Sequence, residues 1–371
     1  MTHRTSSTVV ISTHTHTSVQ LPTTVGLDLS DRVSHYHVQR GDGVTLATGK
    51  VLTTRQHLKA FFQSWKGCRL VIEAGGHSPW ISRLGSECGM EVFVANPRRV
   101  ELISKCDRKT DRTDAQMLTE LGRTNPQLLA PITHRSEQAQ SDLAVPRARA
   151  EAVRSRTAYI NHVRGVLKSN GYRAPSVSAD SFGKRVSASI PPQLEVALRP
   201  ILDLIVALTA TIKDYDQKIE QLAEQRYPIT QLLRPIAGVG PIVSLSFVLT
   251  LDDPKRFRSA RDVGAYVGLV PRKKSSGASD PQLHITKAGD RGLRRLLVIA
   301  ANYILGHFGP DCDLRRYGLK IAGNGNDRIA KKRARIAVAR KLAVLMHHLW
   351  RTGEVYDPFY MAKKRGEYPA A

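Results

Sequence analysis

The sequence predicts a mixed α/β domain, followed by a long helical arm and a second globular domain that is mainly α-helical. Short apolar runs first alternate with turn residues, heptad-like spacing follows, and glycine-punctuated turns then alternate with amphipathic segments. We expect domains at 23–130, 131–228 and 229–360, with a disordered tail at 1–22 and a second tail at 361–371.

The first domain is expected to contain a mixed sheet with helices on its faces. The runs VGLDLS (25–30), SHYHVQ (34–39) and VTLATG (44–49) are separated by polar or glycine-containing breaks, which predicts an antiparallel meander. The remaining expected elements are a helix through Leu58 and Trp65, a strand at 68–74, a short helix around Trp80 to Leu84 and a strand at 91–97.

The arm is predicted from helical periodicity. One face of a predicted helix carries the apolar residues Val153, Ile160, Val163 and Leu167. Asn170 and Gly171 end this helix. A second segment alternates steps of four and three, as in a coiled coil, at Ile201, Ile205, Leu208, Ile212, Tyr215, Ile219 and Leu222. Two interpretations stay open: the seam pairs between subunits, or it forms an internal helical hairpin packed on its own domain.

The second globular domain combines tight turns with basic helices. PIAGVG (235–240) precedes an apolar segment, and HITKAGDRGLRRLL (284–297) leads from a loop into a helix. Between residues 328 and 350, apolar residues on one side of a predicted helix (Ile329, Ile336, Leu342, Leu345, Met346 and Leu349) are surrounded by Lys and Arg. Such a helix is often only a solvated surface, but the high local charge favours phosphate contact.

The charge of the chain indicates a polyanionic partner. Fifty-six Lys and Arg against 32 Asp and Glu give a formal charge of +24, and residues 254–351 alone hold 22 basic and 6 acidic side chains. Nucleic acid is therefore the expected partner. The four cysteines (Cys68, Cys88, Cys106 and Cys312) have no paired or metal-type spacing, and no apolar run approaches the ~20 residues that span a bilayer. We expect a cytosolic protein with reduced thiols and no membrane contact.

Four acidic residues stand out in the first domain. Asp28 lies between two leucines in the first strand and should face a cleft, because an unpaired buried carboxylate is costly. Glu73 ends the fourth strand in front of AGGHSP, and Asp111 and Asp114 would project from one face of a helix. Four carboxylates on two strands and a helix are the ingredients of a two-metal phosphoryl-transfer site that holds Mg²⁺.

A simpler interpretation of Asp111 and Asp114 is an N-terminal helix cap, since acids favour the first turn of a helix. Either aspartate alone fits that interpretation better, whereas the set of four favours the metal site. Lys109 and Arg112 would then face the nucleic acid.

VGLDLS, VIEAGG and KTDRTDAQ, in this order and spacing, resemble the DEDD signature of the RuvC-like domain in transposases of insertion sequence family one-ten. PIAGVG, FRSARDVGAYVGLVPRKKSSG and ITKAGDRGLRRLL resemble the serine transposase domain of that family, and the resemblance runs from about Val25 to Phe359. It implies an RNase H-like (RuvC-like) fold for the first domain. The family's four Mg²⁺-binding catalytic acids fall on Asp28, Glu73, Asp111 and Asp114.

The same resemblance places the catalytic serine at Ser276, directly before Gly277 in GLVPRKKSSG, with Ser275 as the alternative. Cations at Arg272, Lys273 and Lys274 would stabilise its alkoxide and hold the scissile phosphate. Without the resemblance, Ser-Ser-Gly would be interpreted as a flexible turn in a basic loop. The following ASDPQ departs from the glycine-rich, basic pattern of the family.

Nucleic-acid contacts are expected over much of the chain. PIAGVG resembles a helix-hairpin-helix turn, whose backbone amides can hold a phosphate, although Gly-Val-Gly suits any tight turn. The full expected set is Lys109, Arg112, Gly238, Gly240, Arg272, Lys273, Lys274, Lys287, Arg294, Arg295, Lys331 and Lys332.

The resemblance implies a DNA transposase or recombinase that is guided by a structured noncoding RNA from its own element. It further implies a homo-oligomer, a dimer or tetramer, in which the RuvC-like domain of one subunit and the serine domain of another build a composite site. Ser276 would form a phosphoserine link with DNA, and the protein would act on donor and target DNA in the bacterial cytoplasm, at the nucleoid.

Two other functions stay open. A metal-dependent, structure-selective nuclease would need only the four acids and would leave free DNA ends. A non-catalytic nucleic-acid-binding protein would use its basic C-terminal half, and the acids would be helix caps. The placement of acids at strand ends beside glycines speaks against a pure binding protein.

Overall fold

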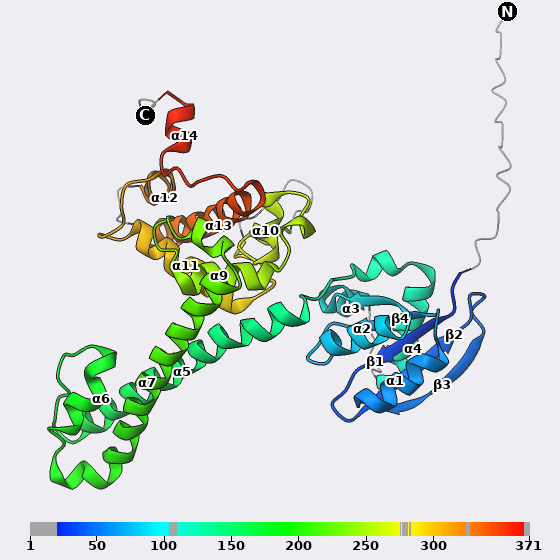
Figure 1. Cartoon of the computed structure of the whole chain (residues 1–371), viewed down its shortest axis with the longest axis horizontal. Helices are drawn as coiled ribbons and strands as arrows, with labels where there is room; N and C mark the ends of the chain where they lie inside the picture. Colours follow the sequence, from blue (N-terminus) through cyan, green and yellow to red (C-terminus); the bar gives the residue numbers. More distant parts are fainter. Residues whose placement is uncertain are drawn as a thin grey trace, which may run out of the picture. The chain divides into compact units, whose positions relative to one another are not determined.

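The computed structural model describes residues 21–103, 110–274, 276, 281, 283–323 and 327–366. It divides into two compact units, Met1–His134 and Arg135–Ala371. The first unit holds a mixed β-sheet with helices, and the second unit is helical, as the sequence predicts (Figure 1). Most of the expected N-terminal tail (1–20) and the end of the second tail (367–371) lie outside the described residues.

The sheet of the first unit has the strand order β3-β2-β1-β4-β5. Its strands are β1 (Thr24–Asp28), β2 (Val33–Gln39), β3 (Thr45–Leu52), β4 (Arg69–Glu73) and β5 (Glu91–Ala95). The first three strands form the predicted antiparallel meander, whereas β4 and β5 run parallel to β1. The carboxyl ends of β1, β4 and β5 therefore lie at the same edge of the sheet.

Helices cover both faces of this sheet. Val25, Leu27, Leu70 and Ile72 pack into one core with α1 (Arg55–Ser64) and α2 (Ser78–Glu87). Alternate residues along the strands face the other side. There Val71 packs with residues of α3 (Pro97–Ile103), α4 (Asp111–Thr124) and the short helix η1 (Pro126–Leu129).

Helix α4 lies unusually close to the sheet because small residues separate them. A Cβ atom added to Gly26 of β1 would lie 2.3 Å from both the Ala115 carbonyl oxygen and the Thr119 hydroxyl. The Gly26 N–H donates to that hydroxyl at 3.0 Å, and Thr119 is fully buried. Farther along α4, a Cβ on Gly122 would lie 2.2 Å from a methyl group of Val71. Glycine in these two positions thus fixes the distance between helix and sheet.

The arm belongs to the second unit and is an antiparallel pair of helices, α5 (Glu137–Ser169) and α7 (Glu195–Gln225), with α6 (Ala179–Ser187) at its tip (Figure 1). Arg149 bonds Asp216, and Arg226 bonds Asp142, which shows the antiparallel register. The arm is therefore an internal hairpin. Near its base, Leu143 and Ile219 pack with Leu245 and Leu249 of α9 (Pro241–Leu251).

The seam of α7 is rotated by one residue from the predicted heptad. Ile205, Ile212 and Ile219 are buried as expected, but the alternate positions are Leu202, Thr209, Asp216 and Ala223, each one residue after the predicted one. Thr209 and Asp216 are polar and bond to arginines of α5. Scanning for apolar residues alone therefore selected the neighbouring Leu208 and Tyr215, which are half-buried.

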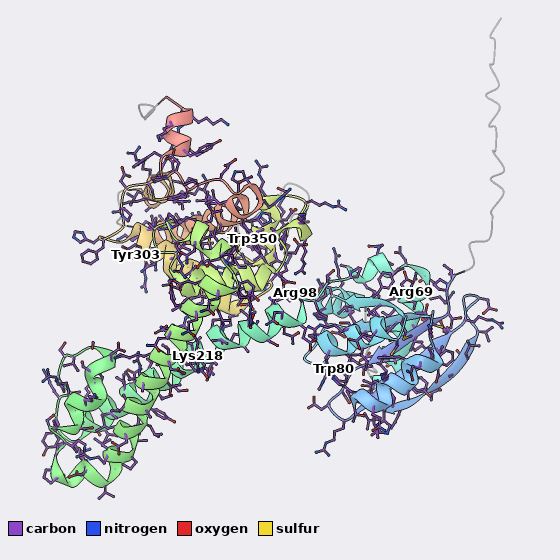
Figure 2. All side chains as sticks on the ribbon, in the orientation of Figure 1. Arg69, Trp80, Arg98, Lys218, Tyr303 and Trp350 are labelled. Carbon is purple, nitrogen blue, oxygen red and sulfur yellow. The ribbon has the colours of Figure 1, made fainter. Side chains whose placement is uncertain are left out.

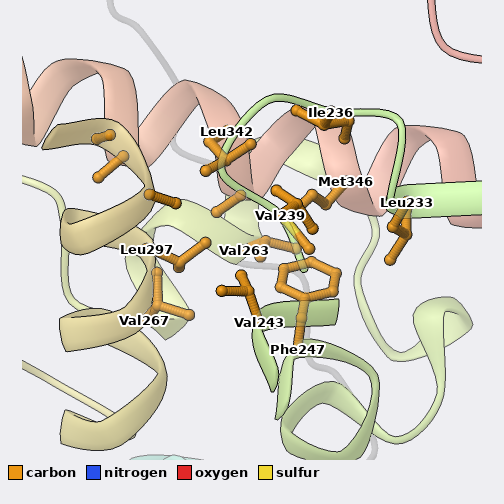
Figure 3. Close-up of a cluster of buried hydrophobic side chains, with 14 of the residues drawn as sticks. Leu233, Ile236, Val239, Val243, Phe247, Val263, Val267, Leu297, Leu342 and Met346 are labelled. Carbon is orange, nitrogen blue, oxygen red and sulfur yellow. The ribbon is translucent and has the colours of Figure 1, made fainter. Parts of the chain in front are cut away.

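The rest of the second unit is built from helices around one apolar core (Figure 3). They are α8 (Ile229–Leu233), α9, the short helix η3 (Pro254–Arg256), α10 (Ala260–Tyr266), α11 (Arg291–Leu305), α12 (Asp313–Ala322), α13 (Arg328–Thr352) and α14 (Tyr360–Lys364). Phe247 of α9 lies at the centre with Val263, Leu297, Leu342 and Met346.

The apolar face of α13 differs from the predicted one at its start. Ile329 is 59% exposed, so its inclusion in the apolar face was wrong, whereas Ala334, Val338, Ala339 and Ala343 are buried. Small residues let α13 approach α10 and α11 closely, and a search for large apolar side chains overlooks them. Within the part of the chain that the structure describes, no helix is long and apolar enough to cross a membrane.

Candidate active site and nucleic-acid interface

Two of the four predicted acids end neighbouring strands. The register pairs Leu27 of β1 with Ile72 of β4, so Asp28 and Glu73 are the next residues on adjacent parallel strands. Both are half-buried. Because side chains alternate along a strand, Asp28 shares the face of Gly26 and Glu73 shares that of Val71, which is the face that α4 covers. Their carboxylates therefore point toward the same layer.

The first turn of α4 lies over these strand ends. Arg69 (Figure 2), at the start of β4, donates to the carbonyl of Gly122 near the end of α4 at 2.7 Å. Ala115, near the start of the helix, lies over Gly26. Helix α4 thus runs antiparallel to β1 and β4, and its first turn, with Asp111 and Asp114, reaches the edge where the two strands end.

His35 links α4 to this edge. The register places His35 of β2 directly opposite Asp28, and its Nδ1 lies 3.4 Å from an Oδ2 atom of Asp111. The His35 side chain is 20% exposed, against 65% for Asp111. The His35 imidazole thus contacts Asp111 from the position on β2 that lies opposite Asp28.

The two aspartates are not needed to cap the helix. Thr110 is the N-cap: its hydroxyl accepts from the Thr113 N–H, and the Thr113 hydroxyl accepts from the Thr110 N–H at 3.0 Å, which completes a capping box. Asp111 and Asp114 still benefit from the positive end of the helix dipole. The N-cap is therefore Thr110, and the helix dipole is the remaining structural reason for acids in this turn.

The side chains of the four acids do not converge on one point. Among the described residues, no group of three or more His, Cys, Asp or Glu side chains lies close enough to hold a metal ion. The evidence for a shared site is therefore the placement of the strands and helix that carry the acids. Lys109, expected to lie beside them, is outside the described residues, and Arg112 is exposed on the first turn of α4.

Histidines hold the loops that follow Asp28 and Glu73. His77 Nε2 lies 2.9 Å from Asp31 Oδ1, and Trp80 (Figure 2) donates to His77 Nδ1 at 3.2 Å. Ser78 is buried; its hydroxyl accepts from the Gly75 N–H and lies 2.9 Å from His134 Nε2. The first contact joins the loop after β1 to the loop after β4, so both acids have fixed surroundings.

In the second unit, the predicted serine lies between two short segments, 270–272 and 284–286, that pair as a narrow antiparallel ribbon. Pro271 and Ile285 form a bridge, the Arg272 N–H donates to His284 O at 2.9 Å, and the Thr286 N–H donates to Val270 O at 2.9 Å. Ser276 is exposed, as are the three preceding cations Arg272, Lys273 and Lys274. The alternative, Ser275, is outside the described residues, as is Gly277.

Glycines close the base of this ribbon tightly. A Cβ on Gly268 would lie 2.3 Å from the backbone of Ala288, and one on Gly289 would lie 1.9 Å from the Tyr266 carbonyl oxygen; both glycines have positive φ. Lys287 between them also has a positive φ of 54°, which is strained for a residue with a Cβ. Its side chain is exposed. The backbone here is thus fixed by close contacts, and Lys287 is presented at a strained position.

Arg294 has structural contacts at the same base. Its Nη1 atom donates to the carbonyls of Val267 (3.0 Å) and Ala288 (2.6 Å), and the side chain is half-buried. Arg294 therefore ties α11 to the ribbon that carries Ser276. Its contact with nucleic acid stays a prediction, as does that of Arg295, which is exposed on α11.

Asp290 joins this ribbon to the arm. It caps α11 by accepting from the Leu293 N–H at 2.8 Å, and its other oxygen accepts from Arg147 of α5 at 2.7 Å, with Arg135 at 3.8 Å. Burial alone would raise the pKa of Asp290, but these hydrogen bonds and charges outweigh burial and hold the pKa below its ordinary value. The base of the serine ribbon is thus fixed to the first arm helix.

The remaining predicted contacts lie on separate elements of the second unit. Gly238, with φ of 77°, forms the turn between α8 and α9, where a Cβ would lie 3.0 Å from the Ala300 carbonyl oxygen; Gly240 is the N-cap of α9. Lys331 and Lys332 are exposed on the first turns of α13. The turn predicted at PIAGVG thus joins two helices, α8 and α9. Its likeness to a helix-hairpin-helix and its contact with phosphate stay predictions.

Sequence reasoning overlooked His35 and Asp290. His35 could have been found by counting the register across the short β1–β2 turn, which places it opposite Asp28. Asp290 could have been recognised as an N-cap before a helical run. Its arginine partner Arg147 is 143 residues away in the chain, and no local pattern indicates that contact.

The sequence of the chain is similar to that of known transposases in both units. A family model described as "Transposase" (DEDD_Tnp_IS110) matches residues 25–170, and the model "Transposase IS116/IS110/IS902 family" matches residues 230–315. The chain is 31% identical to the transposase for insertion sequence element IS1328 of Yersinia enterocolitica, over 75% of this chain and 83% of that protein.

Two other transposases are similar to this chain over comparable lengths. The chain is 28% identical to the transposase for insertion sequence element IS1111A of Coxiella burnetii, over 83% of this chain and 85% of that protein. It is 29% identical to a probable family 20 transposase of Pseudomonas aeruginosa, over 76% of this chain and 83% of that protein. Matches that extend through both units, together with the two family models, establish that the chain belongs to the IS116/IS110/IS902 family of insertion-sequence transposases.

Proposed function

We propose that this transposase is an RNA-guided DNA recombinase that cuts and rejoins DNA with an acidic Mg²⁺ site and a serine nucleophile. The observation that carries the proposal is the position of α4, whose first turn lies at the edge where β1 and β4 end. Asp28, Glu73, Asp111 and Asp114 are thereby carried to one edge of one sheet. The strand order and the antiparallel β2 support an RNase H-like (RuvC-like) fold for this unit.

The donor set fits Mg²⁺, because hard divalent cations prefer carboxylate oxygens and need only a few of them beside phosphate oxygens. Asp28, Glu73, Asp111 and Asp114 would hold the cation, which when bound stabilises the charge on the attacking and leaving oxygens of phosphoryl transfer. His35 would keep Asp111 close to the strand ends.

Ser276 would supply the nucleophile. Its Oγ forms a bond to the scissile phosphorus while the bond from phosphorus to the leaving strand breaks; the serine gives up its proton, and the leaving hydroxyl gains one. A hydroxyl of the exchanged strand then attacks the phosphoserine and releases Ser276, so no phosphodiester is hydrolysed. The exposed Arg272, Lys273 and Lys274 support this role, since cations stabilise both the alkoxide and the phosphate.

The guide RNA and the oligomer are further parts of the proposal. A formal charge of +24 supports binding to polyanions, which in this proposal are DNA and a structured RNA. Val196 and Leu204 of α7 are 92% and 46% exposed, which supports contact between arms of different subunits. The active unit would then combine the acidic site of one subunit with Ser276 of another.

The test is RNA-dependent recombination by purified protein with Mg²⁺, element-end DNA and RNA transcribed from the flanks of the element. Asp28→Asn, Glu73→Gln, Asp111→Asn and Asp114→Asn should each reduce the rate by more than about 100-fold, because each removes a metal ligand. Glu120→Gln is the matched control, since it removes one exposed charge from the same helix α4. Wild-type rates in Asp111→Asn and Glu120→Gln alike would refute the metal site.

A further inference from the structure

The second unit contains a cavity that none of the residues discussed above explains. Its volume is about 760 Å³, within the range of about 300–1,000 Å³ typical of small-molecule sites. It lies between α12, α13 and the segment 354–365. The residues used below are Tyr317 and Lys320 of α12, Lys341 and His348 of α13, and Tyr356 and Tyr360 from the last segment.

The wall of the cavity is held by contacts within the chain. Asp313 at the start of α12 accepts from the Met361 N–H at 2.6 Å, and the Asp313 N–H donates to Pro358 O at 2.8 Å. Asp357 forms an ion pair with Lys363 at 3.0 Å. The two backbone contacts of Asp313 join the segment 354–365 to α12, and the ion pair links two residues within that segment.

Three tyrosines give the cavity an aromatic lining. Tyr317 of α12 and both Tyr356 and Tyr360 of the segment 354–365 line it, together with Leu345 and Leu349 of α13. Tyrosine rings offer flat apolar surfaces on which a planar aromatic ligand can stack. The Tyr360 side chain is 56% exposed, so this part of the lining is open to a ligand.

Three carboxylates line the cavity, those of Asp313, Glu354 and Asp357, and Asp313 accepts from the Met361 N–H through one of its oxygens. Glu354 lies 3.2 Å from His348 Nε2, and Asp357 forms an ion pair with Lys363, so both carboxylates have partners within the chain. Within the described part of the chain, neither Lys320 nor Lys341 forms an ion pair with a carboxylate. The cavity therefore presents positive charge next to aromatic rings.

Lys341 is the better defined of the two cations. Its Nζ lies 3.8 Å from the centre of the Tyr317 ring, a cation–π contact that holds the ammonium in the cavity. Burial lowers the pKa of Lys341 below its ordinary value, and nearby Asp313 opposes this effect only in part. A nearby anion, such as a phosphate, stabilises the charged form of an ammonium group that is partly removed from water.

We propose that this cavity binds one unpaired nucleotide, with its base against the tyrosine rings and its phosphate at Lys341 and Lys320. Neither an apolar ligand nor an inorganic anion alone would use both features. A free mononucleotide and an unpaired nucleotide of a DNA or RNA strand share this chemistry. The site is separate from the four acids and from Ser276, and it adds a single-nucleotide contact to the proposed function.

The experiment is calorimetric titration of the full-length protein, without Mg²⁺, element DNA or RNA, with four probes: dAMP, deoxyadenosine, inorganic phosphate and the tetranucleotide (dA)₄. In wild type, dAMP or (dA)₄ should bind about 10-fold more tightly than deoxyadenosine or phosphate, because only a nucleotide combines stacking with charge. Preference for dAMP identifies a free nucleotide as the ligand, and binding of (dA)₄ alone identifies a strand.

Variants locate the binding. Lys341→Met should weaken nucleotide binding about 10-fold. Lys213→Met, which removes the same charge from an exposed position on α7, should leave the affinity unchanged. Tyr360→Ala tests the aromatic part and replaces Lys341→Met should that variant not fold. Equal nucleotide affinity in wild type and in both cavity variants, or phosphate binding as tight as nucleotide binding, would overturn the proposal. Because no recombination is measured, failure of the proposed function would leave this result unchanged.

Discussion

His35 contacts one acid of the proposed metal site from the strand position opposite another. It lies opposite Asp28 on the neighbouring strand and contacts Asp111 at 3.4 Å. His35 thus connects the side chain of Asp111 to strand β2 at the sheet edge. We assign His35 a positioning role for the proposed metal site.

His35→Gln should raise the Mg²⁺ concentration needed for half-maximal recombination by about 10–100-fold, the range for residues that orient a metal ligand. The control is His57→Gln, since His57 is an exposed histidine of α1 that bonds only locally to Thr54. The measurement is the recombination rate as a function of Mg²⁺. A positioning role predicts recovery at high Mg²⁺, and an unchanged Mg²⁺ dependence would contradict it.

The acids themselves could be predicted from sequence because each stands beside a local signal. Asp28 and Glu73 end apolar strands, and Asp111 and Asp114 lie in the first turn of a helix. His35 gave no such signal, because its partner lies on a helix 76 residues later, and only the strand register brings the two together. Local pattern therefore found the acids but not the residue that orients one of them.

At the scale of elements, the distance between α4 and the sheet controls the proposed site. Gly26→Ala would place a Cβ 2.3 Å from backbone oxygen and force α4 away from β1. We expect a loss of about 1–3 kcal/mol in the free energy of unfolding, typical of overpacking, together with loss of recombination.

Urea denaturation measures the effect of Gly26→Ala. The control is Gly165→Ala in α5, where an added Cβ has no atom within 4 Å and should stabilise the helix by about 0.5–1 kcal/mol. Unaltered stability in Gly26→Ala would mean that the helix and sheet are not in close contact.

The base of the arm gives a pH-dependent prediction. Asp142 accepts from Tyr227 at 2.7 Å, Arg226 at 2.9 Å and Gln138 at 3.0 Å. Burial alone would raise the pKa of Asp142, but these hydrogen bonds outweigh burial and hold the pKa below its ordinary value of 3.8. Because the folded-state pKa is the lower one, the carboxylate stabilises the fold above about pH 4, and this contribution is lost as the pH falls through the folded-state pKa.

Asp142→Asn should therefore lower the free energy of unfolding at pH 7 by about 1–3 kcal/mol, because it removes the charge from the hydrogen bonds that the buried carboxylate accepts, and by less near pH 3. Chemical denaturation at the two pH values measures this difference. Asp214→Asn is the control, because Asp214 forms only an exposed ion pair with Lys218 on α7 and should change stability little. An equal loss at both pH values would show that charge is not the cause.

The arm also shows where sequence reasoning reaches its limit. Helix length and the antiparallel arrangement followed from periodicity, but the seam was displaced by one residue because Thr209 and Asp216 occupy positions facing α5. Polar residues that are satisfied by arginines can lie in a helical interface, and an apolar heptad search does not include them.

For the whole molecule, the excess of positive charge predicts strong salt dependence of nucleic-acid binding. Lys331→Gln and Lys332→Gln on α13 should each reduce the slope of log K against log salt by about 1, as loss of one phosphate contact does. Binding titrations from about 50 to 200 mM salt measure the slope, because the release of counterions from the nucleic acid makes affinity strongly salt-dependent in this range. Lys213→Gln is the control, and an equal slope change in it would mean that only total charge matters.

The division into an α/β part and a helical remainder could be predicted from the sequence, because periods of 2 and 3.6 are local properties. The closeness of α4 to the sheet depends on Gly26 and Gly122, which are 96 residues apart and have meaning only once packed. The link from Asp290 to the arm likewise exists only in three dimensions. Long-range contacts therefore had to be learned from the structure.

The most direct measurement is the search for a covalent protein–DNA product, by denaturing gel with and without protease, after reaction with Mg²⁺, element-end DNA and flank-derived RNA. Covalent serine recombination predicts a slow, protease-sensitive, RNA-dependent band that persists in Ser275→Ala and disappears in Ser276→Ala. RNA-independent cleavage to free ends, unaffected by Ser276→Ala, would contradict it and identify a metal-dependent nuclease.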